Sequence, residues 1–337
     1  MFFQSWPRLA VALSLSATVL ATAFAAGPTK PIFVLNSLDA DISVVDPVSF
    51  KQIKRIPTGK EPHHLYLSPD EKSLLVANAL GDSLTFLDPH TGEVQRVVHG
   101  IADPYHLRFS PDMKWLITAA NRLDHVDFYS WTPANKAEPL KLVKRISAPK
   151  TPSHLAIDSK SSTLFVSLQD SNELLAVDMA TQTPRWKIKV GEMPADIFLT
   201  ADDKHILVAL TGDSVVEIYD VSAPGNTPPK LVKRLPTGKG AHSFRAWGDR
   251  RHVLVSNRVA NSISKIDTQN FTVVDKFPGP SGPDDMEVLS DGKTILVTSR
   301  WAGKLTEIDT KTRKVVRQVR VGKSPHGVYT LDHQPRQ

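Results

Sequence analysis

Residues 60–100 read KEPHHLYLSPDEKSLLVANALGDSLTFLDPHTGEVQRVVHG, and this stretch decides the fold of the chain. It holds four short apolar runs, HHLYLS, SLLVANA, SLTFLD and VQRVVHG, which are separated by turn residues such as Pro, Gly and Asp. Runs of about 4–8 residues bounded in this way are typical of β-strands. Four strands in roughly 40 residues, repeated along a chain, indicate the blade of a β-propeller.

The repeat can be counted from an aspartate at the end of each third strand. Ser130 takes its place in one copy, and the other copies have Asp46, Asp88, Asp178, Asp220, Asp267 and Asp309. Seven markers predict an all-β, seven-bladed propeller with four antiparallel strands per blade, in one domain spanning residues 27–337. The predicted blades are residues 31–59 together with 323–332, 60–100, 101–148, 149–191, 192–238, 239–279 and 280–322.

The two ends of the repeat region are expected to meet. The first copy lacks its own opening strand, whereas SPHGVYTLD at 324–332 matches the opening strand of a blade. We therefore expect the C-terminal strand to complete blade 1. Such closure removes the sheet edges that invite aggregation.

The first 26 residues have the pattern of a secretory signal peptide. Arg8 precedes an apolar stretch from Leu9 to Phe24, and small residues follow at the expected cleavage site. We therefore expect a periplasmic or secreted protein that is a monomer and is not inserted in a membrane after cleavage.

The formal charge of +6 lies largely in runs such as LVKR. We interpret these runs as solvated outer strands rather than as a nucleic-acid site.

The phrases SPDEKSLLVANALGDSLTFLDPHTGEV and SDGKTILVTSRWAGKLTEIDTKTRKV resemble the bacterial YVTN-type β-propeller repeats. The resemblance extends from Pro31 to Asp332. It implies the propeller fold strongly and a function only weakly, because the superfamily includes the haem d1 domains of cytochrome cd1 nitrite reductases, lactonases and surface proteins. The chain has no Cys-x-x-Cys-His motif, so the cytochrome c part of a nitrite reductase is missing from it.

Histidines gather where the opening strand of each blade lines the axial channel. Two adjacent positions of the repeat hold six of the 12 histidines of the chain. Imidazole and carboxylate groups are ligands for zinc and copper. The candidate metal ligands are His64, His106, His154, Asp196, His63, His242, Asp285 and His326. The alternative interpretation is structural: Pro-His before the opening strand recurs in these repeats, and the imidazole caps loop backbone there.

A second set of candidates lies in the loops between the second and third strands. Arg122, Arg258 and Arg300 can bind carboxylates or phosphates, and Trp301 can stack on a flat ligand. Together with the histidines, this set fits an anionic haem-type tetrapyrrole or another organic anion. Three solvated arginines at the rim of the channel are the alternative.

Three charged residues interrupt the apolar pattern of the opening strands: Arg108, Arg245 and Glu287. Arg245 and Glu287 occupy equivalent positions in neighbouring blades, and a buried charge requires a partner. We therefore expect these two residues to form an ion pair between blades 6 and 7.

The leading functional hypothesis is a propeller that binds a ligand, a metal ion or a protein partner at its histidine-rich channel. The first alternative is an enzyme at the same place, either a haem d1-type oxidoreductase or maturation factor, or a lactonase-like hydrolase. The second is an interaction scaffold that uses the proline-rich loops at 131–141 and 222–230. No catalytic residue is assigned, because the chain has no nucleotide-binding, zinc-protease or serine-hydrolase motif. Metal binding is expected to weaken as the pH falls through about 6.5, the ordinary histidine pKa.

Overall fold

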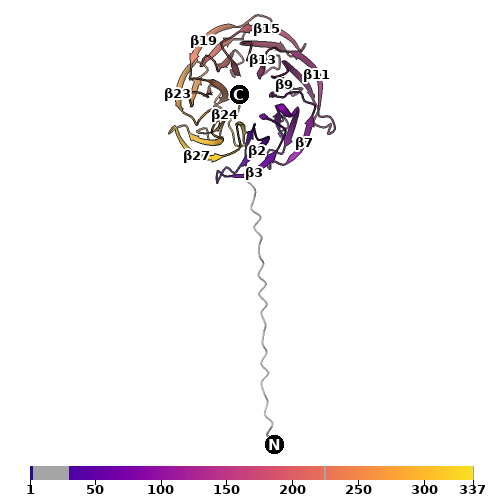
Figure 1. The fold of residues 1–337 in the computed structure, drawn as a ribbon, viewed down its shortest axis with the longest axis vertical. Helices are drawn as coiled ribbons and strands as arrows, with labels where there is room; N and C mark the ends of the chain where they lie inside the picture. The colour runs from indigo at the N-terminus through magenta and orange to yellow at the C-terminus, as the bar shows by residue number, and fades with distance from the viewer. Residues whose placement is uncertain (3–29, 224, 337) are drawn as a thin grey trace.

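A computed structural model describes residues 1–2, 30–223 and 225–336 of the chain. The described residues form seven four-stranded antiparallel sheets arranged in a ring, which confirms the predicted seven-bladed β-propeller (Figure 1). The predicted signal peptide lies outside the described residues. No helix in the described ranges is both long enough and apolar enough to cross a membrane.

Each sheet is one blade, and its strands follow one another from the channel to the rim. Blades 1 to 4 contain β28 (Pro325–Tyr329), β1 (Ile32–Asn36), β2 (Asp41–Val45), β3 (Gln52–Pro57); β4 (Pro62–Leu67), β5 (Leu74–Asn78), β6 (Ser83–Leu87), β7 (Val94–His99); β8 (His106–Phe109), β9 (Trp115–Ala120), β10 (His125–Trp131), β11 (Leu140–Ser147); β12 (Pro152–Ile157), β13 (Thr163–Leu168), β14 (Glu173–Asp178) and β15 (Thr183–Lys189). Blades 5 to 7 contain β16 (Pro194–Leu199), β17 (His205–Leu210), β18 (Val215–Asp220), β19 (Lys230–Pro236); β20 (Ala241–Ala246), β21 (His252–Asn257), β22 (Ser262–Asp267), β23 (Thr272–Pro278); β24 (Pro283–Val288), β25 (Thr294–Ser299), β26 (Lys304–Asp309) and β27 (Lys314–Arg320). A short 3₁₀-helix, η1 (Ala79–Gly81), connects β5 and β6.

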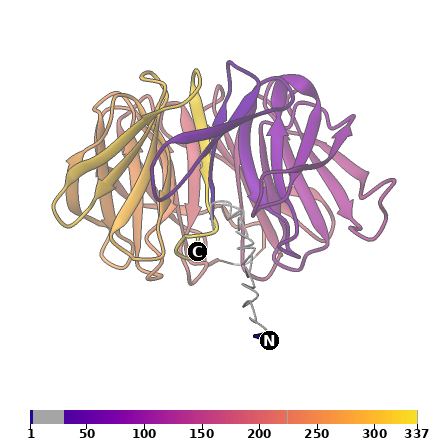
Figure 2. The same cartoon turned by 90° about the horizontal axis from the view of Figure 1, so that it is seen from below.

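The ring is closed by the C-terminal strand, as the sequence predicts. β28 pairs antiparallel with β1, and Phe33 lies opposite Tyr329 in this pairing. The end of the chain is therefore brought to the centre of the ring in Figure 1 and to one face of the disc in Figure 2. We call this the trailing face, because the inner strands end there, and the opposite side, where they begin, the leading face.

The apolar core lies between neighbouring blades rather than at the centre of the ring. One cluster joins Leu35 of blade 1 to Leu74 of blade 2, and another joins Leu296 of blade 7 to Val34 of blade 1. The second and third strands are buried on both faces, as in β5, whereas the outer strand β7 is largely exposed. Because the blades bury their apolar side chains against one another, the channel can be lined with polar groups.

Candidate metal centre in the axial channel

In six of the seven blades the two histidine-rich positions face the channel together because the inner strand pairs irregularly with its neighbour at that point; in blade 3 the pairing of β8 with β9 is regular from His106 onward. In blade 2 the pairing of β4 with β5 shifts register between Pro62 and Leu65, so His63 and His64 lie within the irregular segment. The inner strands of blades 1, 4, 5, 6 and 7 have a shift at the same place. Adjacent residues of a regular strand point to opposite sides, and a bulge removes this alternation. The sequence alone did not reveal this irregularity.

Buried hydroxyl groups on the second strands complete the backbone hydrogen bonds that the irregular pairing leaves open. Ser167 on β13 accepts a bond from the His154 N–H at 3.0 Å and donates one to the Ala195 carbonyl of the next blade at 2.6 Å. Thr298 on β25 bonds in the same way to the Asp285 N–H and the His326 carbonyl. These contacts fix the channel-lining backbone of one blade relative to the next.

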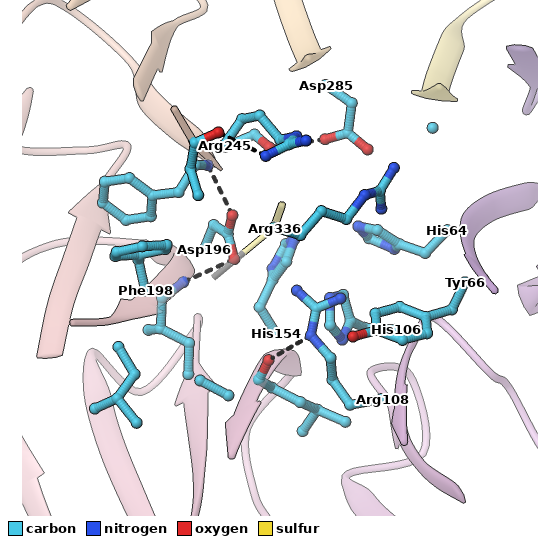
Figure 3. A pocket seen from close by; sticks show the side chains of 18 of the residues that line it. His64, Tyr66, His106, Arg108, His154, Asp196, Phe198, Arg245, Asp285 and Arg336 are labelled. Atoms are coloured by element: carbon cyan, nitrogen blue, oxygen red, sulfur yellow. Dashed lines mark hydrogen bonds between the residues drawn. The ribbon is translucent and has the colours of Figure 1, made fainter. Parts of the chain in front are cut away.

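Three imidazoles from consecutive blades form one group in the channel. The ring centres of His64, His106 and His154 are 4.5 to 5.0 Å apart, and one nitrogen of each lies within 4.8 Å of the others (Figure 3). All three residues are buried. Nitrogens on a tetrahedral zinc ion lie about 3.3 Å apart, given Zn–N bonds of about 2.0–2.1 Å, so a bound ion would draw these rings together.

The orientation of His64 is set by its neighbours. Its Nδ1 lies 2.7 Å from the carbonyl oxygen of Tyr105, which can only accept a hydrogen bond, so Nδ1 carries the proton. The lone pair of the ring is then on Nε2. His63 Nδ1 lies 2.9 Å from the same nitrogen, and the centres of the His63 and His326 rings are 3.7 Å apart. Metal-binding histidines commonly donate their other ring nitrogen in this manner.

Burial keeps five of the channel histidines neutral. It lowers the pKa of His64 to about 3 and that of His242 to about 4. Burial also holds the pKa values of His63, His106 and His154 well below the ordinary value, with a further contribution from neighbouring imidazoles. A neutral imidazole is the form that binds metals. From the sequence we expect protons to compete with a metal ion for these imidazoles near pH 6.5. This expectation is corrected, because burial lowers the pKa values and so moves the competition in the folded protein to lower pH.

A second group lies toward the leading face. One ligand atom of each of His242, Asp284 and His326 falls within 4.8 Å of the others, and all three residues are buried. Arg258 and Arg300 both form ion pairs with Asp284, the latter at 3.3 Å. His242 Nε2 lies 3.2 Å from Asp284 Oδ1, but no ring nitrogen of His242 or His326 has a well-oriented hydrogen bond among the described residues. The two arginines neutralise the only carboxylate of this group, which disfavours a cation there.

The four residues predicted to bind a ligand at the leading face do not line the cavity in the channel. Arg258 and Arg300 contact Asp284, and Arg122 forms ion pairs with Asp103 at 2.5 Å and Glu61 at 2.9 Å. The side chain of Trp301 is next to Gly282, where an added Cβ would lie 2.6 Å from the indole. Their role in ligand binding stays a prediction.

The cavity in the channel extends instead from the three histidines toward the trailing face. Its volume is about 140 Å³. Asp196 also lines it, but its carboxylate accepts the Phe244 N–H at 2.7 Å rather than joining the histidine group (Figure 3). Burial raises the pKa of Asp196 to about 7. Asp285 lines the same cavity and accepts a hydrogen bond from Ser243 at 2.8 Å.

A cluster of buried charges closes the cavity near the trailing face. Arg245 and Glu287 form an ion pair at 2.5 Å, which confirms the pairing expected from the sequence. Arg336 also binds Glu287, and the Arg245 guanidinium donates to the carbonyls of Gln334 and Pro335. Although burial opposes it, the positive charges of Arg336 and Arg245 hold the pKa of Glu287 below its ordinary value. Sequence reasoning missed Arg336, because nothing in the repeat indicates that the tail folds back over the channel.

The fold and the channel define the class: a seven-bladed β-propeller whose axial channel is lined with histidines and ends in a charged cluster. The model of the family described as "YNCE-like beta-propeller" matches residues 7–336, and the chain belongs to this family. No curated protein matches the chain.

Solved structures share the fold at low sequence identity. A functionally unknown protein from Desulfotomaculum acetoxidans has a TM-score of 0.76 and 15% identity, over 90% of this chain and 99% of that one. The periplasmic gluconolactonase PpgL of Pseudomonas aeruginosa has a TM-score of 0.75 and 16% identity, over 91% and 100%. The dihydro-heme d1 dehydrogenase NirN has a TM-score of 0.66 and 16% identity, over 91% and 76%. At these identities the similarity establishes the architecture alone.

Proposed function

We propose that the protein binds a divalent first-row metal ion, zinc or copper, through His64, His106 and His154 in its axial channel. The observation that carries this proposal is the grouping of three buried imidazoles with their ligand atoms within 4.8 Å. Three histidines with a fourth position left for water or a ligand are a common catalytic or binding metal set. The cavity supplies that fourth position on its trailing side.

The chemistry of the surroundings supports a metal better than a structural role for these rings. His106 Nδ1 is buried and has no hydrogen-bond partner among the described residues. Leaving a buried polar group unpaired costs about 1–3 kcal/mol, so histidines that served only as caps would be expected to have acceptors or donors in reach. His64 Nδ1 and His154 Nδ1 have partners in Tyr105 and Ser153, whereas an ion would give the His106 ring the partner that the described residues do not.

The tetrapyrrole alternative is less well supported. Pockets that hold drug-sized ligands usually measure about 300–1,000 Å³. The cavity here measures about 140 Å³, and the arginines expected to bind propionate groups are paired with Glu61, Asp103 and Asp284. NirN is similar to this chain in fold, but a shared fold is no evidence that this chain binds the ligand of NirN.

An enzyme at the same cavity, for example a lactonase-like hydrolase, is the second functional proposal from the sequence. This hypothesis also requires the histidines to bind a metal ion, and it adds that the protein converts a substrate. Activity toward a sugar lactone in the metal-loaded protein, lost in the histidine variant below, would favour it over simple binding. The rim-loop scaffold would require neither the metal nor turnover.

The test is metal binding by the purified protein. Metal-free protein is incubated with zinc or copper(II), separated from unbound ions and analysed for bound metal. We expect one equivalent in the wild type and its loss in H64A/H106A/H154A. The matched control is H90A/H99A/H205A, which removes three histidines outside the channel and should keep the metal. An unchanged metal content in the channel variant, or no binding by the wild type, would contradict the proposal.

We also propose that the protein is exported and acts as a monomer without nucleic acid as a partner. The predicted leader, the closed ring of blades and the basic but dispersed outer strands support this. The gluconolactonase PpgL, a structural neighbour, is described as periplasmic. Cell fractionation with light scattering of the purified protein tests both points; a cytoplasmic or oligomeric protein would contradict them.

A further inference from the structure

We propose that the cavity below the three histidines binds a small organic carboxylate, and that Arg108 holds its anionic end. This inference deepens the proposed function, because it assigns the class of ligand that lies beside the metal. Arg108 is on β8, two residues beyond His106, and it lines the same cavity (Figure 3).

Arg108 differs from the other arginines of the channel in forming no ion pair, although its charge acts on Asp196, which lines the same cavity. Within the parts of the chain that the structure describes, no carboxylate lies within 4 Å of it. Its Nε donates to the Leu155 carbonyl at 3.3 Å, and its guanidinium lies over the ring of Tyr66 at 5.0 Å. The remaining N–H groups of the fork point into the cavity. By contrast, Arg245 and Arg336 are both paired with Glu287.

The contacts of Arg108 also orient it. The hydrogen bond from Nε to Leu155 and the contact with the Tyr66 ring hold the guanidinium in place. Its two terminal NH2 groups remain available as parallel donors. That geometry matches the two oxygens of a carboxylate. A guanidinium fixed in this way loses little side-chain freedom on binding, which favours affinity.

The size and walls of the cavity define the rest of the ligand. A volume of about 140 Å³ suits a molecule of a few heavy atoms rather than a macrocycle or a polymer. Its walls include Phe109, Phe198, Ile157 and Met286, which offer apolar surface to a carbon chain. Inorganic phosphate would bind Arg108 but would make no apolar contact with these walls. A short-chain carboxylate uses both, and a second oxygen can reach a metal held by the histidines.

The experiment separates anion binding from metal binding. Wild type, R108Q and the control R96Q are titrated by calorimetry with acetate, glycolate and inorganic phosphate, each in metal-free and zinc-loaded form. Arg96 is a matched control because its guanidinium also lies over an aromatic ring, that of Phe86 at 4.4 Å, but on the outer strand β7. In R108Q we expect the affinity for acetate and glycolate to fall by roughly 10-fold or more, as loss of a charge-assisted bond implies, and in R96Q to stay unchanged.

The outcomes distinguish this inference from the proposed function. Carboxylate binding by metal-free protein that depends on Arg108 supports the inference even if no metal binds. Zinc binding without any carboxylate binding overturns the inference and leaves the proposed function in place. Equal carboxylate affinity in wild type and R108Q overturns it, and so does binding of phosphate in preference to both carboxylates. The circular dichroism spectrum and melting temperature of R108Q, compared with those of the wild type, show whether the variant is folded, with or without zinc.

Discussion

Two buried polar clusters in the same channel are built on opposite principles. At the trailing face, Glu287 forms ion pairs with Arg245 and Arg336. Arg245 also donates hydrogen bonds to backbone carbonyls of the C-terminal tail. In the histidine group the rings are neutral and face one another, and His106 Nδ1 has no hydrogen-bond partner within the described part of the chain. A buried polar group without a partner destabilises the fold by about 1–3 kcal/mol. The first cluster is held together by opposite charges, although Arg336 Nε has no partner among the described residues, whereas the second has no charge to pair and leaves His106 Nδ1 open for the metal ion that we propose.

The largest expected effect comes from removing the C-terminal segment, which supplies Arg336 to the trailing cluster and His326 to the group near the leading face. Deletion of residues 324–337 removes β28, with His326, and also Arg336. It leaves β1 without its inner partner and exposes unpaired backbone groups along the channel. We expect the truncated protein to aggregate or to lose its cooperative thermal transition, as measured by circular dichroism.

The control is a shorter deletion of residues 333–337. It keeps β28 and the closed ring but removes the tail contacts to Arg245 and Glu287. This variant should remain folded with a lower melting temperature. If the longer deletion melted like the full-length protein, closure by β28 would contribute nothing to stability, contrary to the topology.

The second prediction concerns the trailing cluster alone. Glu287→Gln keeps the shape of the side chain but leaves the buried guanidinium of Arg245 and the partly buried one of Arg336 without a carboxylate, so we expect a loss of about 3–5 kcal/mol in the free energy of unfolding. The matched control is Glu307→Gln, because Glu307 pairs with the more exposed Arg317, at 2.5 Å. Glu307 is itself buried, but a pair with one solvated partner should contribute less than a fully buried pair, closer to the about 0–1 kcal/mol of surface pairs. Chemical denaturation measures both, and equal effects would show that burial does not decide the strength of these pairs.

The contrast between the clusters also explains what the sequence could and could not predict. The repeat of apolar runs and turns predicted the blades, the closing strand and the Arg245–Glu287 pair, because each follows from one position of the repeat. The position of Asp196 outside the histidine group, and the partners of Arg122, Arg258 and Arg300, depend on side-chain directions that the repeat does not determine. Arg336 lies beyond the last repeat, so no alignment of blades could place it against Glu287.

The smallest predicted effect is a change in the pH dependence of stability. Burial lowers the pKa of His242 in the folded protein to about 4, whereas the unfolded chain has the ordinary value of about 6.5. Between these values the unfolded state binds a proton that the folded state does not, so stability falls as the pH falls through 6.5. For one histidine the loss between pH 7.5 and 6.0 is roughly 0.8 kcal/mol. His242→Gln should remove this part of the slope, whereas His90→Gln, at an exposed position, should leave it intact. Urea unfolding of the metal-free proteins at several pH values measures the slope, and an unchanged slope in His242→Gln would show that this imidazole is protonated in the folded channel.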